Sequence, residues 1–278
     1  MPSAAAGLVW ELTNGISQPT RLAIAAGGDV YVVGFGDDRI HHLDVTGHED
    51  GSWGGSGSAA GELDKAAGIA VAPDGSVYVA DHDNYRIQKF TADGRFVLQW
   101  GSKGDKPGQL FGPDGVAVAP NGQIYVTEDE NARVQVFTPD GRFVRSWKGP
   151  QGAPFGDPTG ITFVGDDVVV ADYNESTLSV FDGTGKRLRT FGKPGSRDGE
   201  FAGISLITAD AAGHIFATDY NNGRIQEFDA SGRFVAKFLT PEGERFRRPY
   251  GIGVTREGDL VVAEFLGGRV LRFTPRPN

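Results

Sequence analysis

Carboxylate side chains recur along this chain at a nearly constant spacing, each at the end of a short apolar run. They are Asp81, Glu128, Asp172, Asp219 and Glu264, separated by 44 to 47 residues, and Gly34 stands where a sixth is expected. Carboxylates that a fold brings together can transfer protons, or they can bind a hard cation such as Ca²⁺.

Two roles are open for these acids. In most copies an arginine follows five residues later, for example Arg86, Arg133 and Arg224, so the acid can form an ion pair inside its own repeat. The two glutamates have longer side chains, and we expect Glu128 and Glu264 to reach the centre of the fold as general acid or base. A carboxyl group among apolar rings has a raised pKa, which suits proton transfer near neutral pH.

A second periodic position directly follows the acid and carries mostly rings. Its occupants are Phe35, His82, Asp129, Tyr173, Tyr220 and Phe265. Rings that surround a few polar groups commonly line a small-molecule pocket, although rings also pack between neighbouring repeats. We therefore predict that Phe35, Tyr173, Tyr220 and Phe265 contact a substrate.

A third periodic position lies near the start of each repeat and is occupied by Thr20, Ala67, Asp114, Thr159, Ser205 and Tyr250. Arg21 follows Thr20 where most copies have glycine. Arg21 is suited to hold a carboxylate or phosphate, or to pair with one of the acids. We expect His82, Asp114 and Arg21 to orient a substrate at the catalytic centre, with Tyr250 adding a further ring.

These positions recur because a whole repeat recurs six times, most clearly at 68–101 and 115–149. In these two copies, short runs of alternating apolar residues are separated by Asp-Gly or Asn-Gly turns. This pattern is typical of four antiparallel strands, which form one blade of a β-propeller. The last copy lacks its fourth run, and residues 7–11 resemble it. We therefore predict one all-β domain over 1–278, a six-bladed propeller whose N-terminal strand completes the last blade.

The fragments YVADHDNYRIQKF, IYVTEDENARVQVF and IFATDYNNGRIQEF resemble the NHL repeat, and this resemblance covers nearly the whole chain. It implies a six-bladed propeller but leaves the function open, because NHL propellers include interaction platforms, RNA binders, sensors and amidating lyases. The lyases carry zinc-binding histidines at the third periodic position. None of its six occupants here is histidine, so we predict no zinc site. We expect no required cofactor, with Ca²⁺ in the central channel as an alternative.

Composition limits the partners that we expect. The chain has no cysteine and a formal net charge of −9. The absence of cysteine is typical of a reducing compartment, so we predict a cytoplasmic protein.

The acidic charge argues against nucleic acid as a partner. No basic leader or long apolar stretch is visible, so no signal peptide or membrane association is expected. The densest basic run, Arg245 to Arg248, is expected to be a solvated loop or an anion contact.

Two functions of different class follow. In a propeller, the loops after the second strand and before the first strand share one face, here called the top face, where binding sites form. We predict a non-redox enzyme of the lyase, cyclase, isomerase or hydrolase type, with a small organic substrate, an aromatic compound being one option, in a top-face pocket. The alternative is a scaffold whose top face binds a protein or peptide, with the aromatic residues as anchors.

Overall fold

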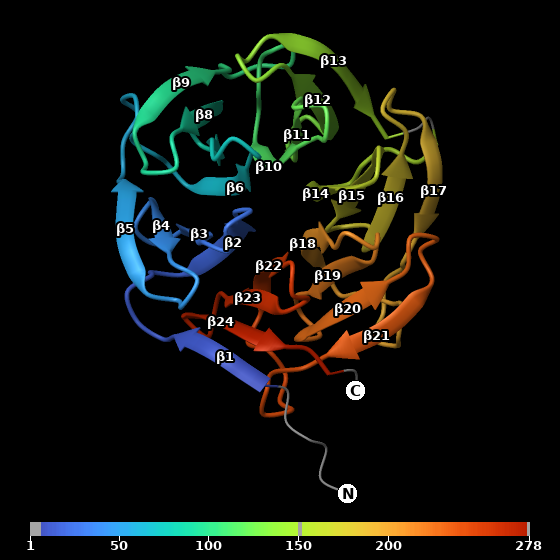
Figure 1. The fold of residues 1–278 in the computed structure, drawn as a ribbon. Helices are drawn as coiled ribbons and strands as arrows, with labels where there is room; N and C mark the ends of the chain where they lie inside the picture. The colour runs from blue at the N-terminus through green and yellow to red at the C-terminus, as the bar shows by residue number, and fades with distance from the viewer. Residues whose placement is uncertain (1–6, 150–151, 277–278) are drawn as a thin grey trace, which may run out of the picture.

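Six four-stranded antiparallel sheets surround a common axis in the computed structural model, which describes residues 7–149 and 152–276 (Figure 1). The sheets follow one another around the ring in chain order. This arrangement confirms the predicted six-bladed β-propeller. The described residues include no helix that is long and apolar enough to cross a lipid bilayer.

Each blade runs from an innermost to an outermost strand. Blade 1 consists of β2 (Pro19–Ile24), β3 (Val30–Gly34), β4 (Arg39–Leu43) and β5 (Glu49–Gly54). Blade 2 consists of β6 (Ala66–Val71), β7 (Val77–Asp81), β8 (Arg86–Phe90) and β9 (Phe96–Trp100). Blade 3 consists of β10 (Pro113–Val118), β11 (Ile124–Glu128), β12 (Arg133–Phe137) and β13 (Phe143–Lys148).

The second half of the ring repeats this order. Blade 4 consists of β14 (Pro158–Val164), β15 (Asp167–Asp172), β16 (Thr177–Phe181) and β17 (Arg187–Phe191). Blade 5 consists of β18 (Ile204–Ala209), β19 (Ile215–Asp219), β20 (Arg224–Phe228) and β21 (Phe234–Phe238). Blade 6 consists of β22 (Pro249–Val254), β23 (Leu260–Glu264), β24 (Arg269–Thr274) and, as its outermost strand, β1 (Gly7–Leu12).

The N-terminal strand closes the ring as predicted. Strand β1 pairs antiparallel with β24, and the two lie side by side at the rim in Figure 1. An ion pair of 2.6 Å between Arg269 and Glu11 reinforces this pairing. Because β1 covers the outer edge of β24, blade 6 has the same four-stranded form as the other blades.

The hydrophobic core lies between neighbouring blades. One cluster, for example, joins Tyr78 and Ile87 of blade 2 to Val116 and Val126 of blade 3. Strands in the middle of a blade pack against a blade on each side and are buried throughout, as in β7. The outermost strands are largely exposed and cover only one neighbour.

A tryptophan and a glycine connect successive blades at the rim. Trp53, in the outermost strand β5 of blade 1, lies against Gly94 in the last turn of blade 2. Trp100, in β9 of blade 2, lies against Gly141 in the same turn of blade 3. Trp10, Trp147 and Phe191 lie in the same way against Gly47, Gly185 and Gly232. A Cβ on any of these glycines would overlap the ring, and each glycine also has a positive φ.

Candidate functional site

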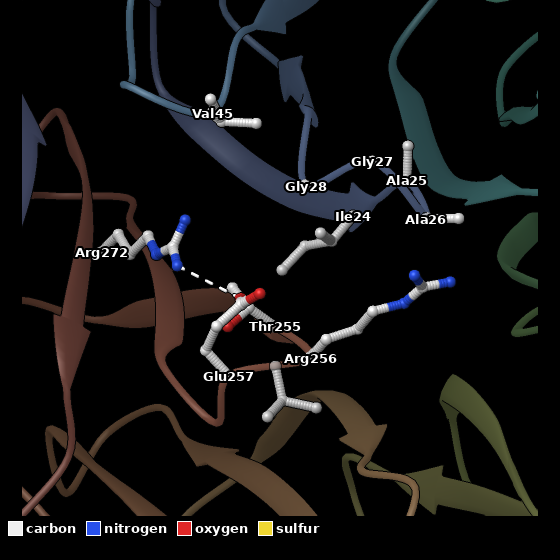
Figure 2. A pocket seen from close by; sticks show the side chains of 11 residues that line it. Ile24, Ala25, Ala26, Gly27, Gly28, Val45, Thr255, Arg256, Glu257 and Arg272 are labelled. Carbon is white, nitrogen blue, oxygen red and sulfur yellow. Dashed lines mark hydrogen bonds and ion pairs between the residues drawn. The ribbon is translucent and has the colours of Figure 1, made fainter.

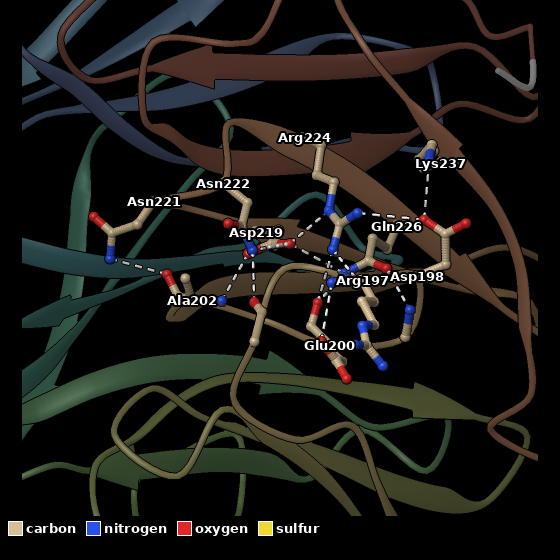
Figure 3. A network of polar contacts seen from close by, with 12 residues as sticks. Arg197, Asp198, Glu200, Ala202, Asp219, Asn221, Asn222, Arg224, Gln226 and Lys237 are labelled. Carbon is tan, nitrogen blue, oxygen red and sulfur yellow. Dashed lines mark hydrogen bonds and ion pairs between the residues drawn. The ribbon is translucent and has the colours of Figure 1, made fainter.

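The five periodic acids lie inside their own blades. In blade 5, Asp219 accepts hydrogen bonds from the backbone N–H of Ala202 (2.9 Å) and from the side chains of Asn222 (2.9 Å), Arg224 (2.7 Å) and Gln226 (3.1 Å) (Figure 3). The buried carboxylate thus ties the second strand to the third and to the preceding loop. Asp81 has the equivalent partners in blade 2.

The prediction that Glu128 and Glu264 reach the axis is wrong. Glu128 accepts hydrogen bonds from Arg133 (2.6 Å) and from the backbone N–H of Phe111 (2.9 Å). Glu264 makes the same contacts with Arg269 and with the N–H of Arg247. The extra methylene of glutamate is accommodated inside the blade, and both side chains are fully buried. Neither carboxylate can therefore contact a ligand at the axis.

A cavity of about 200 Å³ lies on the top face beside the axis, and we call it the top-face cavity. Loops after β3 and β7 and the first residues of β2, β6, β10 and β22 form its walls. Its lining residues are Thr20, Arg21, Phe35, Lys65, Ala66, Ala67, His82, Asp83, Asp114 and Tyr250. Five of the predicted site residues, Arg21, Phe35, His82, Asp114 and Tyr250, therefore meet in one place.

Arg21 and Asp114 form an ion pair across the axis, between blade 1 and blade 3. The Arg21 side chain is 1% exposed, and its guanidinium also lies 5.5 Å from the ring centre of Tyr250. Burial raises the pKa of the Asp114 carboxyl, whereas the positive charge of Arg21 opposes that rise. The Nη1 atom of Arg21 is buried and has no hydrogen-bond partner among the described residues.

His82 is held between two carboxylates. Its Nδ1 lies 2.6 Å from Asp83, and its Nε2 lies 3.2 Å from Asp129 of blade 3. The hydrogen bond with Asp129 raises the pKa of His82 to about 9 against the opposing effect of burial, and the bond with Asp83 adds to the rise. At neutral pH the imidazole is therefore positively charged and can donate a proton.

Asp157 is a second group with a shifted pKa. It lies just before β14, at the top of blade 4. Burial raises the pKa of Asp157 to about 6, and the negative charges of Asp114, Asp129 and Asp172 add to the rise. A carboxyl group with this pKa can accept or donate a proton under physiological conditions.

The predicted aromatic residues form a continuous row over blades 4, 5 and 6. Ring centres are 6.3 Å apart for Tyr173 and Tyr220, 5.6 Å for Tyr220 and Tyr250, and 6.2 Å for Tyr250 and Phe265. Tyr250 connects this row to the top-face cavity. The site therefore has aromatic residues on one side and ionised residues on the other.

Sequence reasoning missed several members of the ionised side. Asp129 occupies a position expected to carry a ring, and its acidity there was the available signal. Lys65 and Asp83 pair at 2.5 Å at the edge of the cavity and lie outside the periodic positions. Asp157 lies in the linker between blades 3 and 4, where the repeats differ most, so no periodic signal marked it.

The ionised residues do not form a preassembled metal centre. Asp114 is paired with Arg21, and Asp83 and Asp129 are paired with His82. No group of three or more histidine and carboxylate side chains within 7–149 and 152–276 is placed to hold a metal ion. Ca²⁺ in the central channel thus stays a prediction without a donor set that fits it.

Two other cavities lie along or below the axis. The innermost strands line a central channel of about 330 Å³, mainly with aliphatic side chains such as Leu22, Ile69 and Ile252. On the bottom face, a cavity of about 290 Å³ separates turns of blades 1 and 6 (Figure 2). Glu257 and Arg272 pair there at 3.4 Å, and Arg256 is a further cation. Neither cavity combines a proton donor with a proton acceptor of shifted pKa.

Comparison with known sequences agrees with this architecture. The SMP-30/gluconolactonase/LRE-like region matches residues 59–171, and a 6-bladed beta-propeller family matches residues 150–239. Protein brain tumor of Drosophila melanogaster is 30% identical over 127 residues, and protein lin-41 of Caenorhabditis elegans is 44% identical over 48 residues. These matches span 45% and 17% of this chain but only 12% and 4% of the relatives. The predicted resemblance to NHL-repeat proteins is confirmed, and the fold is that of a six-bladed propeller.

Solved structures show the same fold. A streptogramin B lyase superimposes with a TM-score of 0.69 at 17% identity, covering 96% of each chain. A catalytically inactive virginiamycin B lyase from Staphylococcus aureus, with quinupristin, gives a TM-score of 0.68 at 20% identity over 96% of this chain and 87% of that one. At this level of identity the likeness concerns the fold, and the chemistry has to be argued from the site.

Proposed function

We propose that the protein is a non-redox enzyme that acts on a small, partly aromatic organic substrate in the top-face cavity. The observation that carries this proposal is a protonated imidazole, His82, in the lining of the cavity, together with a carboxyl group of raised pKa, Asp157, whose charge interacts with Arg21 and Asp114 of the same lining. Reactions that remove one proton and supply another, such as elimination or ring opening, need such a pair. The likeness to lyase propellers supports this reaction class.

Each group has a role that follows from its surroundings. Asp157, when ionised, accepts the proton that leaves the substrate, and His82 donates a proton to the departing group. Arg21, a cation in the cavity lining, attracts a carbonyl or carboxylate oxygen, and the row of tyrosines contacts the aromatic part of the substrate. This scheme replaces the predicted roles of Glu128 and Glu264, whose carboxylates lie inside the blades.

A substrate screen followed by paired variants tests the proposal. Small aromatic lactones, esters, acids and amines are screened by thermal shift, since a ligand that binds only the folded state raises Tm. Turnover of any compound that binds is then compared in His82→Gln and Asp157→Asn. We expect each to lower kcat by roughly 10²-fold or more. His214→Gln, which changes a histidine on the bottom face, serves as the control and should leave turnover unchanged.

The alternative, a scaffold that binds a protein or peptide, is supported by exposed apolar side chains at the top rim. Phe35 is 37% exposed and Leu266 is 60% exposed. Exposed apolar groups beside a cavity are common at interaction surfaces. Absence of any thermal shift across the screen, together with capture of a defined peptide that is lost in Leu266→Asp, would favour the scaffold over the enzyme.

A further inference from the structure

Three blades hold a buried arginine in the same way. Its Nε donates to the acid that ends the second strand, at 2.6 to 2.7 Å, and its terminal nitrogens donate to backbone carbonyls of the preceding loop. A glutamine two residues later also donates a hydrogen bond to the acid (Figure 3). These arginine sites are Asp81–Arg86–Gln88, Glu128–Arg133–Gln135 and Asp219–Arg224–Gln226.

Blade 4 keeps the acid but replaces the other two side chains by short ones. Thr177 stands at the arginine position and Ser179 at the glutamine position. Asp172 is 5% exposed, and its hydrogen-bond donors within 7–149 and 152–276 are the backbone N–H groups of Gly156 (2.7 Å), Asp157 (3.0 Å) and Glu175 (3.1 Å). No cationic side chain of the described residues lies within 4 Å of this carboxylate.

The space released by these replacements is a cavity of about 360 Å³, which we call the blade-4 cavity. Its lining includes Phe155, Asp172, Glu175, Thr177 and Ser179, together with Thr190, which faces Ser179 on the outermost strand. These are the elements that enclose the guanidinium in the other blades: the acid, the third strand, the fourth strand and the preceding loop.

Blades 1 and 6 also depart from the pattern, but in both of them the blade's own side chains occupy the space that is open in blade 4. Blade 6 keeps an arginine, Arg269, on Glu264. Blade 1 lacks the acid, but Asp37 and His41 occupy the space, and a Cβ on Gly34 would meet both of them. Blade 4 is thus the blade in which a buried carboxylate faces an open cavity.

We propose that the blade-4 cavity binds the guanidinium group of an external ligand with an aliphatic stem. The guanidinium replaces the missing arginine side chain: Asp172 accepts its hydrogen bonds as the equivalent acids do in blades 2, 3 and 5. Glu175 adds a second carboxylate at the exposed end of the cavity. Arg187 is a cation at the rim, so a ligand that carries a carboxylate beyond its guanidinium, as arginine does, is favoured over a doubly cationic one.

Asp157 links this site to the top-face cavity electrostatically, because its charge interacts with Arg21 and Asp114 in the lining of that cavity. The backbone N–H of Asp157 donates to Asp172, and the charge of Asp172 contributes to the raised pKa of the Asp157 carboxyl. A bound guanidinium offsets that negative charge. Occupation of the blade-4 cavity should therefore lower the pKa of Asp157 without a contact between the two ligands.

Calorimetric titration tests the proposal with ethylguanidinium as the probe and ethylammonium as the matched cation without the guanidinium fork. The double variant Thr177→Arg/Ser179→Gln rebuilds the internal arginine site. Leu188→Arg adds the same charge to an exposed position of blade 4 and is the control. We expect the wild type and Leu188→Arg to bind ethylguanidinium, the double variant to bind it at least roughly tenfold more weakly, and ethylammonium to bind weakly throughout.

Two results of these titrations would overturn the proposal. Equal binding by the wild type and the double variant, or no binding by the wild type at millimolar ligand, overturns the proposal. Titrations with L-arginine and with N-acetyl-arginine amide then distinguish a free amino acid from an arginine within a peptide. Because none of these substitutions touches the top-face cavity, a failed substrate screen there leaves the test unaffected.

Discussion

At the scale of single residues, the charge state of His82 depends strongly on its neighbours. With the folded pKa raised to about 9 from 6.5, the protonated form stabilises the fold fully below about pH 6.5. That stabilisation is lost as the pH rises through 9. We expect the free energy of unfolding to decrease between pH 6.5 and 9 by on the order of 2 to 3 kcal/mol more in the wild type than in His82→Gln.

Denaturant unfolding at several pH values measures this difference, and NMR titration of the imidazole measures the pKa directly. Asp129→Asn removes the largest cause of the rise and should bring the pKa of His82 back toward 6.5. An unchanged pKa in Asp129→Asn would mean that Asp129 does not hold the imidazolium, and the proposed proton donor would lose its support.

The buried pair of Arg21 and Asp114 makes a second prediction at this scale. Arg21→Met leaves the Asp114 carboxylate buried without a counter-charge, so we expect a loss of roughly 3 to 5 kcal/mol of unfolding free energy. Arg21→Met/Asp114→Leu removes both charges and should recover most of that loss. Urea unfolding of the two single variants and the double variant gives the coupling energy. Additive losses would show that the two residues do not interact.

The sequence was informative at periodic positions and uninformative elsewhere. Arg21, His82, Asp114 and Tyr250 were predicted because symmetry brings equivalent positions to one axis. Asp157 was not predicted because it lies in a linker that the repeat does not specify. Glu128 and Glu264 were misassigned because side-chain length alone does not reveal direction, and the arginine five residues later binds either acid equally well.

At the scale of elements, the rim glycines serve two requirements at once. Gly94 has a φ of 80°, and a Cβ there would lie 2.5 Å from the ring of Trp53. Gly75 has nearly the same φ of 82°, but its nearest atom would be 3.7 Å away. The sequence predicted both as turn residues. It could not reveal the ring, because the tryptophan comes from the preceding blade.

These two glycines allow backbone strain to be separated from blade packing. Gly75→Ala should cost about 1 to 2 kcal/mol, the price of a left-handed conformation for a residue with a side chain. Gly94→Ala adds displacement of the Trp53 ring, and we expect it to cost at least 2 kcal/mol more. Thermal unfolding monitored by tryptophan fluorescence compares them. Equal losses would show that the ring adjusts freely.

At the scale of the whole molecule, β1 determines whether the ring is closed. Removal of residues 1–12 leaves the edge of β24 unpaired and breaks the ion pair of Arg269 with Glu11. We expect a lower Tm and self-association through the exposed edge. Removal of residues 1–6 alone is the control and should change neither. Light scattering and calorimetry measure both effects, and a monomer of unchanged Tm without residues 1–12 would contradict this account.

The pairing of β1 with β24 also has a consequence for biosynthesis. The ribosome completes β1 first and its partner last, about 260 residues later, as the 258-residue separation of Glu11 and Arg269 shows. At typical elongation rates of about 5 to 20 residues per second, the first strand waits for roughly 13 to 50 seconds before its partner exists. During that interval β1 of the nascent chain is unpaired. We therefore expect a chaperone to act on the nascent chain after β1 has emerged from the ribosome.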